Sequence, residues 1–270
     1  MKKLTAILLT LVLSLSCVSA LAAEKVSIIA TPSPHAEILE LIKDDMLALG
    51  YELDITVVTD YVVENPATSA GDVMANFFQH VPYLAGYNAE VSDNEKLVGV
   101  IFTHFEPFAI YKGTKSDLKD LVKGDKIVIP NDPSNRNRAL LLLQEAGLIK
   151  VPEDTTIESQ KGIEDITENT LGLEIIEANA ELIAGLRDDA AFCIINGNNA
   201  ALAELSPVAD GVYYESADSL AATAYVNLVA VRPENVEADF VKALTTCIYS
   251  QKVYDLILSR GFVPTFEVVK

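Results

Sequence analysis

Short apolar runs alternate with longer amphipathic stretches from residue 26 onward. The run at 26–30 is largely apolar, the stretch at 34–49 carries apolar residues at helical spacing, and 51–59 returns to strand-like alternation. A strand, a helix and a second strand in this order are typical of a right-handed βαβ unit, because parallel strands need a crossover connection. The pattern therefore predicts an open α/β sheet.

The same rhythm recurs in the segment 126–148. A strand at 126–129 is followed by Asp132 and Pro133, which are typical of an N-cap and a first helical residue. Gly147 is placed to end the helix as a left-handed C-cap. The start of this helix offers backbone N–H donors and a partial positive charge, so the junction favours a small carboxylate ligand.

Two interruptions of this rhythm suggest two lobes. A strand at 96–103 is broken by Pro107, and a strand at 224–231 is placed to make the return crossing. We therefore expect two open α/β lobes around a hinged cleft, joined by two crossover strands. The predicted division is a signal peptide at 1–22, a first lobe formed by 23–107 and 228–270, and a second lobe formed by 108–227.

The N-terminus has the pattern of an export signal. Lys2 and Lys3 precede an apolar run at 4–15, and small residues follow. Cleavage after Ala22, within an A-x-A pattern, would release a soluble protein, whereas an imperfect lipobox would leave Cys17 lipidated. Both readings place the protein in the periplasm or at the cell surface. No later stretch reaches the roughly 20 apolar residues that a membrane span requires.

The charge of the chain limits its possible binding partners, and the positions of its cysteines indicate the state of the thiols. The net charge is −19, and removal of Lys2 and Lys3 makes it 18 − 39 = −21. Such a surface repels nucleic acid and anionic membrane, so a membrane association is expected only through a lipid anchor or a transporter. Cys193 and Cys247 lie in apolar or helical patterns, which predicts buried free thiols.

Arg138 is the main candidate for binding a carboxylate. It lies one turn beyond Ser134 and Asn135, whereas Arg136 points to another face of the same helix. A guanidinium can hold a carboxylate through two parallel hydrogen bonds. The alternative is an arginine on a solvated helix face.

Several segments together resemble the NlpA/MetQ-like methionine-binding lipoproteins of bacterial ABC importers. The matching segments are ATPSPHAEIL at 30–39, ANFFQHVPYL at 75–84, Glu106-Pro107 with Tyr111, 129–143, INGN at 195–198 and YVN at 225–227. The resemblance implies a type II periplasmic-binding fold. It also implies capture of methionine, with L-methionine as the first expectation, for a membrane permease and its ATPase.

The resemblance also implies roles for individual residues. Arg138 would hold the ligand carboxylate, and Asn196 and Asn227 would contact the amino-acid moiety. Tyr61, Phe78, His80 and Tyr83 would surround the thioether. Chemistry adds an acceptor for the ammonium, which Glu106 or the amide oxygens can supply, and Asn135 and Asn198 complete the candidate set. Aromatic rings suit a polarisable thioether. Asn137 and Asn199 depart from residues frequent in the family, so side-chain selectivity could differ.

Other functions stay open at this point. The same fold could bind D-methionine, a methionine-containing dipeptide or a related amino acid, or act as a surface adhesin. A metal receptor could use His35, His80 and His104 with Glu106. The sequence carries no G-x-S-x-G, P-loop or H-E-x-x-H motif, so we expect neither an enzyme nor a cofactor. We expect a monomer.

Overall fold

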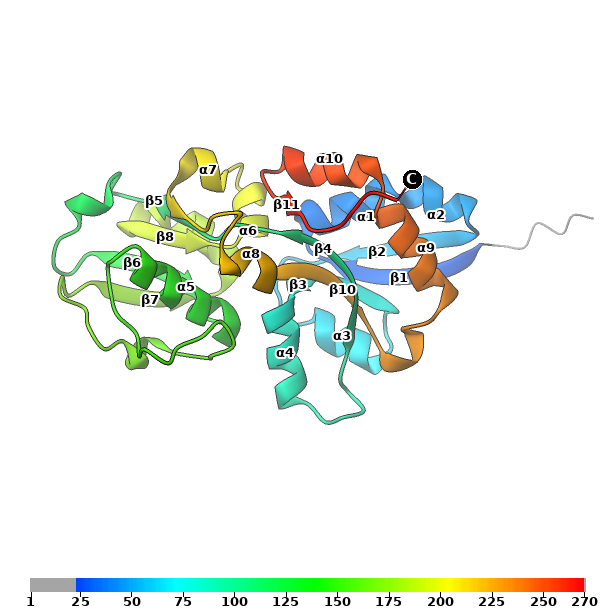
Figure 1. Cartoon of the computed structure of the whole chain (residues 1–270), viewed down its shortest axis with the longest axis horizontal. Helices are drawn as coiled ribbons and strands as arrows, with labels where there is room; N and C mark the ends of the chain where they lie inside the picture. Colours follow the sequence, from blue (N-terminus) through cyan, green and yellow to red (C-terminus); the bar gives the residue numbers. More distant parts are fainter. Residues whose placement is uncertain (1–22, 270) are drawn as a thin grey trace, which may run out of the picture.

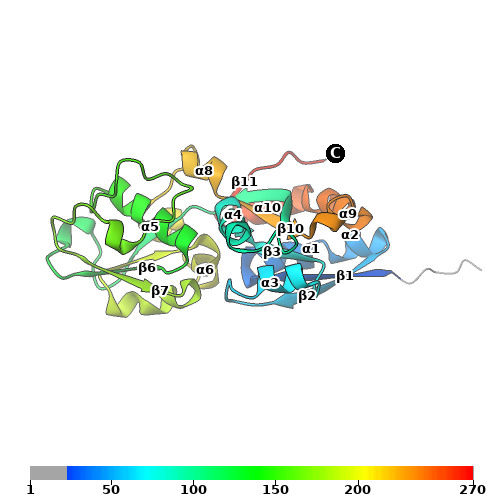
Figure 2. The same cartoon turned by 90° about the horizontal axis from the view of Figure 1, so that it is seen from below.

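The computed structural model describes residues 23–269, and its strands form two separate sheets. The predicted signal peptide, Cys17 and both cleavage readings lie outside these residues. Figures 1 and 2 show the two sheets side by side along the long axis of the molecule. Among the described residues, no helix is both long and apolar enough to cross a membrane.

The first sheet contains six strands in the order β11-β4-β10-β3-β1-β2. Their bounds are β1 Glu24–Ala30, β2 Tyr51–Val57, β3 Ala75–His80, β4 Val98–Phe105, β10 Val226–Val231 and β11 Val263–Pro264. The helical elements beside them are η1 Pro32–Ala36, α1 Glu37–Leu41, α2 Lys43–Ala48, α3 Glu64–Ala70, α4 Val81–Glu90, η5 Pro233–Asn235, α9 Asp239–Ile248 and α10 Gln251–Ser259.

The second sheet contains five strands in the order β7-β6-β8-β5-β9. Their bounds are β5 Ala109–Lys112, β6 Lys126–Pro130, β7 Glu174–Ala178, β8 Phe192–Ile195 and β9 Gly211–Tyr214. The remaining helical elements are η2 Leu118–Asp120, α5 Pro133–Glu145, η3 Ile163–Asp165, η4 Ala180–Asp189, α6 Gly197–Leu202, α7 Pro207–Asp210 and α8 Leu220–Ala224.

The two sheets share one topology. In each sheet, three parallel strands (β2-β1-β3 and β7-β6-β8) are followed by an antiparallel strand. The chain forms this antiparallel strand directly after it leaves the other sheet. That strand is β10 in the first sheet and β5 in the second. The segments 106–108 and 215–225 connect the two sheets.

Apolar side chains cover both faces of the first sheet. Ile38 and Leu39 of α1 and Leu244 of α9 belong to one core with β1 and β3. Leu84 of α4 packs with Leu228 on the opposite face, and Figure 1 shows α3 and α4 on that side. Coverage of both faces explains why β3 and β10 are buried throughout, and it leaves the carboxyl ends of the parallel strands as the place for a ligand.

Local signals identified several element boundaries correctly. Asp132 caps α5 by accepting the backbone N–H of Asn135, Pro133 is the first helical residue, and Gly147 has a left-handed φ of 75°. The strand at 126–129 is present as β6. Cys193 and Cys247 are buried free thiols, as predicted.

One prediction differs from the structure. The strand expected to make the return crossing is β10, which pairs wholly within the first sheet, and the crossing itself runs through 215–225 with α8. The exact lobe boundaries stay a prediction.

Candidate ligand-binding site

A small cavity lies where the two sheets meet. All ten residues predicted from the sequence line it: Tyr61, Phe78, His80, Tyr83, Glu106, Asn135, Arg138, Asn196, Asn198 and Asn227. They gather there because they follow or end the strands β2, β3, β6 and β8, or lie in the connecting segment 106–108 and at the start of β10. Gln79 and Gly197 complete the lining.

Arg138 is 4% exposed, and most of its guanidinium is bound within the protein. Nε donates to Glu215 Oε1 at 2.9 Å, and Nη2 donates to Glu215 Oε2 at 2.5 Å and to the Glu106 carbonyl at 2.9 Å. The guanidinium carbon lies 4.1 Å from the centre of the Tyr225 ring. The two-bond pairing that we expected for a ligand is therefore made with Glu215, and the reading of Arg138 as a solvated arginine is wrong.

Several polar atoms of the cavity residues keep hydrogen-bonding capacity. Arg138 Nη1 and Asn227 Nδ2 have no hydrogen-bond partner within residues 23–269. Asn196 Oδ1 is buried and also lacks a partner in this part of the chain. A buried unpartnered acceptor costs free energy, so these groups indicate where a ligand would be bound.

Asn135 holds other cavity residues in place. Its Oδ1 accepts from His80 Nε2 and Asn196 Nδ2, both at 3.0 Å, and its Nδ2 donates to both Asp132 oxygens. The side-chain amide is thus saturated, so Asn135 orients its neighbours. Because His80 Nδ1 accepts from the Tyr83 backbone N–H, the proton of the neutral ring lies on Nε2. Burial, together with the nearby Arg138, lowers the pKa of His80 to about 3.

Three aromatic rings form one wall of the cavity. Phe78 and Tyr83 meet edge to face with centroids 5.5 Å apart, and Tyr61 lies 6.0 Å from each. The Tyr61 hydroxyl donates to Asn198 Oδ1 and accepts from Asn199 Nδ2 at 3.0 Å. Tyr61 and Tyr83 also line a second, larger cavity of about 210 Å³.

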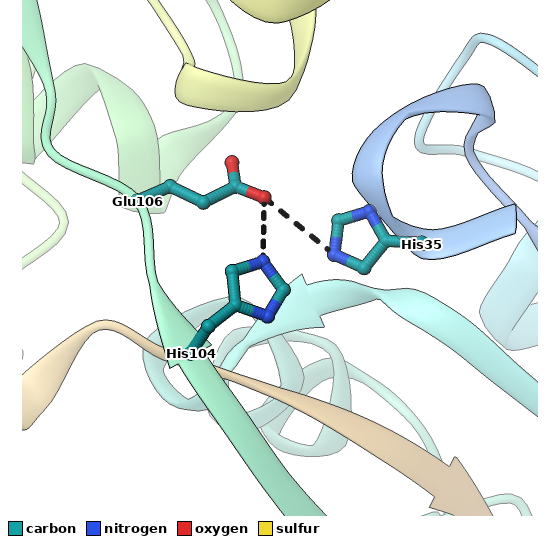
Figure 3. A group of neighbouring side chains, drawn as sticks. All are labelled: His35, His104 and Glu106. Atoms are coloured by element: carbon teal, nitrogen blue, oxygen red, sulfur yellow. Dashed lines mark hydrogen bonds and ion pairs between the residues drawn. The ribbon is translucent and has the colours of Figure 1, made fainter. Parts of the chain in front are cut away.

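Glu106 lies in the connecting segment 106–108, and its carboxylate faces His35 and His104 (Figure 3). Its Oε1 is 2.9 Å from His104 Nε2 and 3.7 Å from His35 Nε2, and its Oε2 accepts the Asn198 backbone N–H at 2.8 Å. Burial alone would raise the pKa of Glu106, but these neighbours together hold that pKa below its ordinary value. Since both oxygens have protein partners, Glu106 is less available to a ligand ammonium than we expected.

The structure separates the three histidines of the predicted metal-site alternative. His35, His104 and Glu106 offer atoms within 4.8 Å of one another, whereas His80 is bound to Asn135. In this group each imidazole already has hydrogen-bond partners at both nitrogens. The outer nitrogens contact Thr31 and Thr103, His104 Nε2 contacts Glu106 Oε1, and His35 Nε2 contacts Asn227 Oδ1 at 3.1 Å. Burial lowers the pKa of His35 to about 4. Hydrogen bonding accounts for these side chains without a cation.

Sequence reasoning missed three residues that shape the site. Gln79 and Gly197 lie inside the matching segments 75–84 and 195–198, but only neighbouring residues were predicted to bind the ligand. A Cβ on Gly197 would lie 2.6 Å from the Glu106 Cβ, so only glycine allows this approach. Glu215 had no local signal, although a buried arginine needs a buried anion, and that need could have prompted a search.

Comparison with known proteins identifies the family of this chain. The model of a family described as NlpA lipoprotein matches residues 26–264. The chain is 36% identical over 239 residues to the methionine-binding lipoprotein MetQ of Bacillus subtilis, covering 87% of this chain and 84% of that one. It is 39% identical over 210 residues to the D-methionine-binding lipoprotein MetQ of Salmonella typhi, covering 76% and 74%.

A solved structure shows the same fold. The nutrient-binding protein of Burkholderia cenocepacia bound to methionine superimposes with a TM-score of 0.83 at 33% identity, covering 89% of this chain and all of that one. This match confirms the periplasmic-binding fold that the sequence predicted. With the family match over most of its length, the chain belongs to the NlpA lipoprotein family.

Proposed function

We propose that this chain is the extracytoplasmic substrate-binding protein of an ABC importer and that it captures methionine. One observation carries the proposal: three cavity residues have polar atoms without a partner among residues 23–269, and these atoms match an α-amino acid. Arg138 Nη1 and Asn227 Nδ2 are donors for its carboxylate, and the buried Asn196 Oδ1 is an acceptor for its ammonium. A binding role needs no catalytic group, so we propose no enzymatic activity.

The aromatic wall suits the methionine side chain. Sulfur of a thioether is polarisable and makes favourable contacts with ring edges, and Phe78, Tyr61 and Tyr83 present rings at several orientations. The wall therefore favours an amino acid with an apolar, polarisable side chain.

Closure of the lobes completes the site. His80 and Tyr61 belong to the part of the chain that forms the first sheet, and they bond to Asn135 and Asn198 of the second. These contacts close the cavity over its polar atoms, and exclusion of water strengthens the charged contacts. The closed form is the one expected to hold ligand.

The partners and location follow from this role. The proposed partners are a membrane permease and its ATPase, with the chain acting as a monomer outside the cytoplasm. Attachment to the membrane would come from lipidated Cys17 or from the transporter, depending on how the leader is processed. The hydrogen bonds of His35 and His104 weigh against the metal hypothesis, and no specific observation at the site supports an adhesin role.

Native mass spectrometry of protein purified without refolding tests the ligand. We expect methionine to be released on denaturation. Calorimetric titration of ligand-free protein with L-methionine, D-methionine, a methionine-containing dipeptide and norleucine then ranks the ligands. Binding of methionine with clear preference over norleucine supports the proposal, and a protein that ignores both methionine enantiomers would overturn it.

A further inference from the structure

Glu215 lies in the second crossing segment and is fixed by three donors. Its Oε1 accepts from Arg138 Nε, and its Oε2 accepts from Arg138 Nη2 and from the Phe108 backbone N–H at 2.9 Å. The residue is 6% exposed. A carboxylate that is buried and bound from three directions has little freedom to turn.

This carboxylate determines where the free edge of Arg138 points. The guanidinium is planar and rigid, so fixing Nε and Nη2 also fixes the direction of Nη1. The Glu106 carbonyl and the Tyr225 ring hold the same group from two further sides. Nη1, which has no protein partner in residues 23–269, is therefore held at the cavity wall.

The neighbours of Arg138 come from both segments that connect the sheets. Glu106 and Phe108 belong to the first segment, and Glu215 and Tyr225 belong to the second. The orientation of the guanidinium thus depends on the relative position of these two segments. This arrangement differs from the pair of Arg136 in α5 with Glu177 in β7, which is partly exposed and 3.4 Å apart.

We infer that Glu215 is a positioning residue for recognition of the ligand carboxylate: it holds Arg138 so that a single nitrogen, Nη1, meets the ligand. The inference rests on the proposed function, because that function places a carboxylate at Nη1. Glu215 itself does not line the cavity, so it acts through Arg138.

Glu215→Gln tests this role with two ligands. The amide keeps the shape but loses the charge and sets an NH2 group against the guanidinium. Calorimetry should show about a tenfold or greater loss of affinity for methionine, the effect of disturbing a charge-assisted hydrogen bond. The affinity for methioninamide, which has no carboxylate, should change much less, so the preference for methionine over its amide shrinks.

Three comparisons make the result decisive. Glu177→Gln removes the charge beside Arg136 and should leave the preference unchanged. Glu215→Asp keeps the charge at a shorter reach; it should retain part of the preference, and it replaces Glu215→Gln if that variant does not fold. Equal losses for both ligands, or tighter binding of methionine, would overturn the inference alone. A wild-type protein that binds no methionine would overturn the proposed function as well.

Discussion

The Tyr61 hydroxyl donates to Asn198 Oδ1 at 2.6 Å, and this bond joins a residue that follows β2 to one in the first turn of α6. The same hydroxyl accepts from Asn199 Nδ2. A single phenol oxygen therefore connects the two halves of the cavity wall in the closed form. Tyr61 contributes to the aromatic wall through its ring and to closure through its oxygen.

Tyr61→Phe should separate these two contributions. The ring stays, while two hydrogen bonds across the cleft are lost at roughly 1 kcal/mol each in net terms. We expect methionine to dissociate about five- to thirtyfold faster, with a smaller change in the association rate. Stopped-flow measurements test this, with Tyr87→Phe as control because Tyr87 lines only the larger outer cavity. An unchanged dissociation rate would contradict a closing role for the hydroxyl.

The Arg138–Glu215 pair should behave asymmetrically in stability measurements. Arg138→Met leaves Glu215 buried without its partner, which typically costs about 3–5 kcal/mol of unfolding free energy. Changing both residues to Met removes both charges, so much of the stability should return while methionine binding stays lost. Urea denaturation and calorimetry on the same three proteins measure both effects. A double variant as unstable as the single one would contradict this account.

Glu64 predicts a pH dependence of stability. It is fully buried, neither side-chain oxygen has a partner among the described residues, and burial raises its pKa from 4.5 to about 8. The unfolded chain releases this proton near pH 4.5 and the folded chain near pH 8, so stability falls as the pH rises between these values. Glu64→Gln should therefore raise the Tm by several degrees at pH 8 and by little at pH 4.5. Glu90→Gln, at an exposed position, is the control; a shift independent of pH would argue against this assignment.

Gly197→Ala should weaken ligand binding by preventing close contact with Glu106. An added Cβ would lie 2.6 Å from the Glu106 Cβ and 3.1 Å from Phe262, so α6 must move away. We expect about a tenfold or greater loss of methionine affinity and a more open form in small-angle scattering. Gly185→Ala adds a methyl group where nothing lies within 4 Å and should bind normally. Equal affinities of the two variants would show that this approach is not needed for binding.

Local patterns placed some of the cavity residues at strand ends, and the resemblance to a known family supplied the others. Asn135 and Arg138 follow a strand with an identifiable helix start, and Asn196 and Asn198 follow an apolar strand. Parallel strands bring such positions to one edge, so sequence order was enough to gather them.

The hydrogen-bond assignments within the site could not be found in the same way. Glu215 is 77 residues from Arg138 and lies in a segment without clear periodicity, so nothing local indicated their pairing. The saturation of Asn135 and the capture of Glu106 by His104 likewise depend on side chains from different elements. The sequence therefore identified which residues meet but not which atoms remain free for a ligand.

The position of β10 has a consequence for export. This strand lies between β3 and β4 in the first sheet, although about 120 residues separate its start from the end of β4. The early strands of that sheet cannot pair fully until residues 226–231 have been synthesised. Long-range pairing of this kind is slow to form, so the first sheet stays incompletely folded while the chain is being synthesised and exported. The order of the strands thus favours passage through the membrane before folding.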